Sequence, residues 1–176
     1  MVIQAEDVFQ VRLSQEEKVL FEQKWDEIGW RTMPHLPGAV EACQLLHEAG
    51  YELICVTAMP HRFADHRLEN FRLHGFPIDK VIGVNYSQKR DSHNPKKETI
   101  KNLNPLIFVD DLKRNFIDLD DLDTKLVYID LQRSDDPYKD ADIFHHASYP
   151  SLLEFVKDFL SDEEEHGKYV AWTEKP

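Results

Sequence analysis

Stretches with the apolar spacing of helices alternate along this chain with short, continuous apolar runs that are typical of strands buried on both faces. From residue 38 to residue 160 the alternation is regular. It predicts a parallel sheet with helices on both faces, that is, a three-layer α/β/α sandwich with a mostly parallel, Rossmann-like sheet. The predicted helices are 14–28, 38–48, 61–74, 97–103, 112–119 and 150–160, and the predicted strands are 51–57, 80–84, 106–110 and 125–131.

The first of these helices carries its own start signal. Ser14 stands three positions before Glu17, which is the spacing of a capping box. Phe21, Trp25 and Ile28 follow four and three residues apart, so they share one face of an amphipathic helix.

Composition limits the classes of partner. The length of 176 residues suits one domain, which we expect to span 1–160 and to leave a polar, acidic tail over 161–176. The net charge of -12 disfavours a nucleic-acid or anionic membrane partner. No apolar run reaches the ~20 residues of a membrane span, and the first residues do not resemble a signal peptide. Cys43 and Cys55 lie in apolar patterns, which favours free thiols, a reducing compartment and hence a cytoplasmic protein.

The chemistry-bearing residues follow the predicted strands. Ligands of parallel α/β sheets bind outside the carboxyl ends of the strands, so these positions are the most informative. The run "LIFV" stops on Asp110 and Asp111. Two adjacent carboxylates repel one another, and a bound divalent cation would explain why they are there. The alternative is that one of them caps the helix that begins at 112.

Two further positions fit a phosphate site. The strand at 51–57 ends in Thr57, and a hydroxyl there with the backbone N–H of Ala58 could hold a phosphate oxygen, although Thr57 could instead be a helix N-cap. Lys96 and Lys97 begin a short helix, where cations oppose the helix dipole. A lysine that reaches a phosphate would explain this choice, and a solvated surface is the alternative.

The order of these residues separates possible folds. The order found along the chain is Thr, then Lys, then Asp-Asp. It excludes a receiver domain, in which the acidic pair comes first. A dinucleotide-binding fold is excluded as well, because no G-x-G-x-x-G follows the first strand. The order resembles that of the haloacid dehalogenase superfamily of phosphotransferases. "ELICVTAMPHR" is similar to its second motif, "PKKETI" to its third and "LIFVDDLKRNF" to its fourth. The resemblance covers roughly residues 34–160, and the short-cap, deoxyribonucleotidase-like group is the most similar.

The resemblance implies a fold and a set of roles. It implies a phosphomonoesterase that acts on a small phosphorylated metabolite or nucleotide with Mg²⁺. Thr57 and Ala58 would bind the phosphate, Lys97 or alternatively Lys96 would neutralise charge, and Asp110 and Asp111 would bind the metal. Residues 14–36 would form a minimal helical cap.

One motif of the superfamily is not found. Its first motif is a strand that ends in D-x-D, and no D-x-D precedes residue 37. Asp7 is the nearest candidate nucleophile, but Phe9 takes the place of the second aspartate. The D-x-D pattern within 118–121 follows the fourth motif and reads as a solvated connection. Three hypotheses remain: an impaired phosphohydrolase or one with a trimmed start, an inactive relative that binds a phosphorylated ligand or a protein, and a generic α/β interaction module. We expect at most weak Mg²⁺ binding and little turnover.

Overall fold

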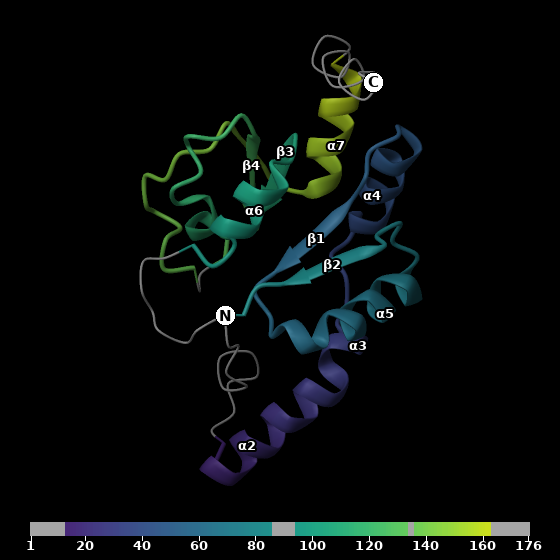
Figure 1. The fold of residues 1–176 in the computed structure, drawn as a ribbon, viewed down its shortest axis with the longest axis vertical. Helices are drawn as coiled ribbons and strands as arrows, with labels where there is room; N and C mark the ends of the chain where they lie inside the picture. The colour runs from purple at the N-terminus through teal and green to yellow at the C-terminus, as the bar shows by residue number, and fades with distance from the viewer. Residues whose placement is uncertain (1–12, 86–93, 134–135, 163–176) are drawn as a thin grey trace.

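The structure is a computed structural model that describes residues 13–85, 94–133 and 136–162. These residues form a mixed α/β fold in which every strand pairing is parallel (Figure 1). The predicted α/β class is therefore confirmed. The helical elements are α2 (Gln15–Lys24), η1 (Trp25–Gly29), α3 (Trp30–Thr32), α4 (Ala39–Glu48), η2 (His61–Phe63), α5 (Ala64–His74), α6 (Lys97–Leu103), η3 (Lys113–Phe116) and α7 (Leu152–Ser161), and the strands are β1 (Ile54–Thr57), β2 (Lys80–Gly83), β3 (Ile107–Asp110), β4 (Lys125–Ile129) and β5 (Ala147–Tyr149).

Local sequence signals explain several of these boundaries. The capping box at the start of α2 is present, since the Ser14 hydroxyl accepts from the Glu17 N–H at 3.3 Å and the Glu17 carboxylate accepts from the Ser14 N–H at 2.8 Å. Gly75 ends α5 with φ of 78°, a left-handed conformation that glycine adopts without strain. Instead of the helix predicted over 112–119, the structure has the short 3-10 helix η3.

The described strands form two sheets, and this corrects one expectation. The single parallel sheet predicted from the sequence would make 51–57, 106–110 and 125–131 neighbouring or near-neighbouring strands, and the pairing of β3 with β4 confirms this for the last two. However, β1 pairs with β2, whereas β3 belongs to a second sheet in the order β3-β4-β5. The reason is that no strand within the described ranges lies between β1 and β3 to join them. β5 is also an addition, because the three residues Ala-Ser-Tyr give no apolar run.

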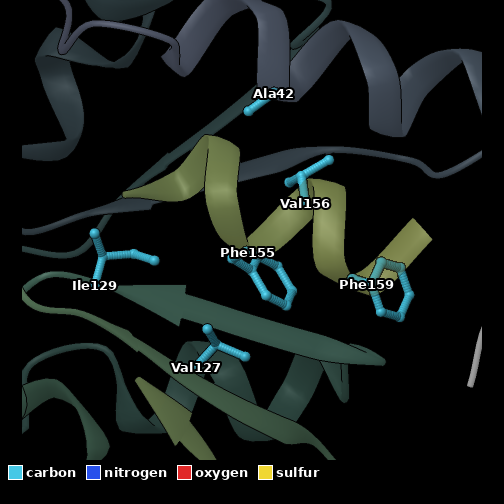
Figure 2. Close-up of a cluster of buried hydrophobic side chains, with 6 residues drawn as sticks. All are labelled: Ala42, Val127, Ile129, Phe155, Val156 and Phe159. Carbon is cyan, nitrogen blue, oxygen red and sulfur yellow. The ribbon is translucent and has the colours of Figure 1, made fainter. Parts of the chain in front are cut away.

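One face of both sheets is covered by a continuous layer of helices. Phe155, Val156 and Phe159 of α7 pack against Val127 and other residues of the β3-β4-β5 sheet, and Ala42 of α4 joins the same cluster (Figure 2). Next to it, Cys43 of α4 packs with Phe71 of α5 and with residues of β1 and β2. α5, α4 and α7 therefore lie side by side on the same face.

The opposite face of the second sheet has its own core. Ile100 of α6 and Phe116 of η3 pack with Phe108, Leu126 and other buried residues. Val56 of β1 contacts this cluster. The two sheets thus share the same two apolar layers, although no backbone pairing connects them within the described residues.

The N-terminal helical segment, residues 15–32, packs on α5 through α3, and α2 projects from there away from the sheets (Figure 1). Its end is anchored, because the Asn70 side chain donates to the carbonyl oxygens of Arg31 and Met33 at 2.8 and 2.9 Å. No residue of α2 is buried, and Ile28 is 51% exposed. Phe21 and Trp25 are partly buried and their rings stack 6.1 Å apart, so the predicted amphipathic pattern is matched at these two positions and not at Ile28. None of the described helices combines the length and the apolar character that crossing a bilayer requires.

Candidate functional site

The turn after β1 is held tightly against the end of β2. The Thr57 carbonyl oxygen accepts hydrogen bonds from the N–H groups of Met59 and Val84, both at 2.9 Å. A Cβ atom on Gly83 would lie 3.0 Å from the His61 Cα atom, so a larger residue at this position would require the turn to shift away from β2. Thr57 and Ala58 are partly buried in this turn, at the carboxyl end of β1.

A buried ion pair lies at the carboxyl end of β3. The Lys96 ammonium is 2.5 Å from the Asp110 carboxylate, and the two side chains are only 13% and 3% exposed. Lys96 caps the start of α6, whereas Asp110 is the last residue of β3. Taking both charges out of water is costly, so such a pair persists only where further hydrogen bonds satisfy its remaining atoms.

Those further hydrogen bonds come from η3. The other Asp110 oxygen accepts from the Leu112 backbone N–H at 2.9 Å and from the Asn115 side-chain amide at 2.8 Å. Asn115 is itself buried, and its amide oxygen has no hydrogen-bond partner in the described part of the chain. Three donors thus fix the orientation of the Asp110 carboxylate.

Asn94 fixes the position of Lys96. Its side-chain amide donates to the carbonyl oxygens of Asn115 and Ile117 at 2.6 and 3.2 Å, and its side-chain oxygen accepts from the Lys96 N–H at 2.9 Å. Asn94 is 2% exposed. It therefore ties the residue that supplies the cation to the turn that orients the carboxylate.

The neighbouring residues of each pair point elsewhere. Lys97 contacts Asp118 at 2.9 Å, and this contact is the main cause of the raised pKa of the Lys97 ammonium. Asp111 contacts the Arg133 guanidinium at 2.9 Å. The sequence left open which lysine faces Asp110, and the structure brings Lys96 to it.

The electrostatics of Cys55 connect the ion pair with β1. Burial is the largest cause of the raised pKa of the Cys55 thiol. The positive charge of Lys96 acts to lower this pKa and the negative charge of Asp110 acts to raise it, so both charges lie within electrostatic reach of β1. Val56 of β1 also packs against the cluster that contains Phe108 of β3, so β1 and β3 lie close to one another.

The placed carboxylates do not by themselves make a divalent-cation site. Carboxylate oxygens are the atoms that Mg²⁺ prefers. However, Asp110 already accepts from an ammonium and from two N–H groups, and Asp111 is paired with Arg133. Within the described ranges, no three Asp, Glu, His or Cys side chains stand close enough to hold a metal ion together.

The structure adds Asn94 and Asn115 to the site, and neither was expected from the sequence. Asp7, the candidate nucleophile, lies outside the described residues. Asn94 and Asn115 were not singled out, because asparagine before proline or in a polar turn reads as a turn former. Their positions could have indicated a role at the site, since Asn94 lies close to Lys96 in the sequence and Asn115 close to Asp110.

Comparisons with known proteins give a similar protein but no matching family model. No protein-family model matches the sequence. A protein of Oceanobacillus iheyensis with the name "Putative nucleotidase OB0422" is 31% identical to this chain over 123 residues. The match includes 66% of this chain and 60% of that protein, so the chain spans about three fifths of the relative's length. The similarity indicates a nucleotidase-like relationship.

Replacing Asn94 by alanine tests the network around the ion pair. We expect the free energy of unfolding to fall by about 1–3 kcal/mol, because two carbonyl groups and the Lys96 N–H would lose a buried partner. Urea denaturation followed by circular dichroism measures this. Asn102→Ala on the exposed side of α6 is the matched control and should change stability by less than about 0.5 kcal/mol. Equal effects of the two substitutions would contradict the role given to Asn94.

Proposed function

We propose that this chain binds a phosphorylated small molecule, nucleotides included, at the carboxyl ends of β1 and β3, as a phosphomonoesterase of the haloacid dehalogenase type with little turnover. The observation that carries the proposal is the buried Lys96–Asp110 pair at a strand end. The similarity to a protein named as a nucleotidase supports the same class of ligand.

Lys96 can serve the carboxylate and a ligand at once. An ammonium group has three N–H donors, and in the described residues one of them contacts Asp110. The others can donate to the oxygen atoms of a phosphate group. Asp110, which accepts from Asn115 and Leu112, holds the ammonium in place during binding.

Thr57 and Ala58 would supply the remaining phosphate contacts. The turn that carries them is held by the hydrogen bonds of the Thr57 carbonyl and by the close approach of Gly83. A hydroxyl and a backbone N–H in such a turn are neutral donors, so they bind phosphate oxygen atoms without adding charge.

Binding alone does not cleave a phosphate ester. Hydrolysis by covalent catalysis needs a nucleophile opposite the leaving group, and a lysine and a metal ion supply position and charge only. Asp7 is the residue we propose for this role, and Phe9 replaces the acid that would normally assist it. The second candidate function is therefore that of an inactive protein that binds a phosphorylated ligand or a protein partner. It is favoured by the ion pair that already engages Asp110.

The role of Lys96 is tested by ligand binding. We expect Lys96→Met to weaken the binding of 5'-nucleotides by about 10- to 100-fold, since it removes a charged donor. Isothermal titration calorimetry well below the unfolding midpoint of each variant measures this. Lys97→Met is the matched control, because Lys97 contacts Asp118, and it should change the affinity by less than about twofold. A larger effect of Lys97→Met would assign the phosphate to the other lysine.

The level of turnover is tested with a panel of phosphomonoesters in the presence of Mg²⁺. We expect turnover far below the roughly 1–10³ per second of ordinary enzymes, because loss of one member of a catalytic unit costs several powers of ten. A turnover within that range that disappears in Asp7→Asn would make Asp7 an efficient nucleophile and refute this expectation. Activity that survives in Asp7→Asn but not in Asp110→Asn would indicate attack by water instead.

Mg²⁺ should bind weakly to the protein in the absence of phosphate. The Asp110 and Asp111 carboxylates are already engaged, and among the described residues no three Asp, Glu, His or Cys side chains stand close enough to hold a metal ion together. Titration of the full chain with MgCl₂ in a calorimeter should give a dissociation constant above the micromolar range. Binding below one micromolar would reveal a ligand that this account lacks.

A further inference from the structure

The start of α5 is held at the carboxyl ends of β1 and β2. These strands are parallel, so the chain leaves the carboxyl end of β1 and returns to the amino end of β2, and α5 lies in this connection (Figure 1). Three residues before α5, the His61 N–H donates to the Asn85 side chain at 3.0 Å, and the His61 backbone packs closely against Gly83. Arg67 is the fourth residue of α5. It therefore lies toward the strand end that carries Thr57.

The Arg67 guanidinium is held in place by its neighbours on α5. Its Nη1 group donates to the Asn70 side-chain oxygen at 2.5 Å, and its central carbon lies 4.3 Å from the centre of the Phe71 ring. Asn70 is 1% exposed, and its amide donates to the carbonyl oxygens of Arg31 and Met33. The position of Arg67 is thus tied, through Asn70, to the end of α3.

The charge of Arg67 has no carboxylate partner among the described residues. Three other arginines form ion pairs there: Arg31 with Glu69, Arg62 with Asp26 and Arg133 with Asp111. Arg67 is also partly buried, and this burial lowers the pKa of its guanidinium. Like Lys96, it stands at the start of a helix, where a cation opposes the helix dipole. The charge is therefore costly in this position unless an anion offsets it.

Arg67 and Lys96 act on the same thiol of β1. Burial raises the pKa of Cys55, whereas the positive charges of Lys96 and Arg67 each act to lower it. Both cations are therefore within electrostatic reach of Cys55, which precedes Thr57 by two residues. An anionic ligand at the end of β1 would lie in the field of both cations.

The two cations belong to opposite faces of the layer of strands. Arg67 lies on Phe71, which packs with α4 on one face. The Lys96 ammonium lies 5.9 Å from the centre of the Phe108 ring, which belongs to the cluster on the other face. They also differ in charge balance, because Lys96 is paired with Asp110. A ligand that spans the two cations would bring one anionic group to Lys96 and another to Arg67.

We propose that Arg67 is a second anion-binding residue of the candidate site, and that the ligand is a small phosphorylated molecule with a second anionic group, either a phosphate or a carboxylate. This inference rests on the proposed function, because it takes the first phosphate to bind at Thr57 and Lys96. The planar guanidinium presents five N–H donors in a fork that matches both kinds of group, and one of these donors contacts Asn70. The second anionic group would supply the charge that the described residues do not give to Arg67.

Isothermal titration calorimetry of the full chain with matched probes tests this inference. AMP is compared with ADP and with adenosine 3',5'-bisphosphate, which add a second phosphate at two different distances. Glycerol 3-phosphate is compared with 3-phosphoglycerate, which carries a carboxylate in place of an alcohol. We expect a probe with two anionic groups to bind at least about 10-fold more tightly than its matched probe with one, since it gains a charge-assisted contact.

Two variants of α5 assign this preference to one residue. Arg67→Gln keeps an amide donor for Asn70 but loses the charge, so the preference should fall below about twofold. Arg72→Gln, at an exposed position of the same helix, is the matched control and should keep the preference. Circular dichroism verifies that each variant is folded at the temperature used.

The outcomes separate this inference from the proposed function. Lys96→Met should weaken the probes of a matched set by similar factors and keep the preference for two anionic groups. If the probes bind through Lys96 but with equal affinity within each matched set, the inference is overturned and the proposed function stands. The same holds if the preference survives in Arg67→Gln. If none of the probes binds to the unmodified chain, both are overturned.

Chemical labelling of the unmodified chain keeps the test decisive if Arg67→Gln does not fold. Phenylglyoxal modifies the arginine side chains that it can reach, and mass spectrometry of the peptides locates them. We expect the probe that binds most tightly to protect Arg67 from the reagent, whereas Arg62 and Arg72, which are exposed, stay labelled. Equal labelling of Arg67 with and without the probe, or no labelling of Arg67 in its absence, overturns the inference.

Discussion

The need to satisfy one buried carboxylate organises the candidate site. Asp110 stands at the end of β3 with its side chain almost completely removed from water. An isolated buried carboxylate would take up a proton or destabilise the fold, so it must be surrounded by donors. One donor, Lys96, lies at the start of α6, whereas the Leu112 N–H and the Asn115 amide belong to the segment around η3. Asn94 connects these two segments by hydrogen bonds. Hydrogen bonds thus fix the orientation of the Asp110 carboxylate and of the Lys96 segment relative to it.

The helix layer places this network next to β1. Because α4 packs on α7 while each covers a different sheet, the two sheets are held next to one another. On the opposite face, Val56 of β1 packs against the apolar cluster that contains Phe108 of β3, and this contact also holds the two sheets together. A site assembled from Thr57 and Lys96 therefore depends on helix packing, since backbone pairing between β1 and β3 is absent from the described residues.

The sequence could predict what depends on local pattern. The helix predicted over 61–74 ends where α5 ends, and apolar runs located β1, β3 and β4 within a few residues. It could not predict what depends on tertiary partners. β5 is three residues long and its strand character comes from pairing with β4, while the choice between Lys96 and Lys97 depends on where α6 begins. The exposure of Ile28 and the separation of the two sheets likewise depend on contacts between distant segments.

The charge balance of the site separates how accurately it can position a phosphate group from how tightly it can bind one. The Lys96–Asp110 and Arg133–Asp111 pairs are each neutral overall, so they offer a phosphate dianion donors but little net positive charge. The same pairs offer a divalent cation oxygen atoms but little net negative charge. A phosphate and a cation brought together would each supply the charge that the other lacks. Their binding should therefore be mutually favourable, and by linkage each must raise the affinity for the other by the same factor. A site of this kind can orient a phosphate ester accurately and still bind its separate components weakly.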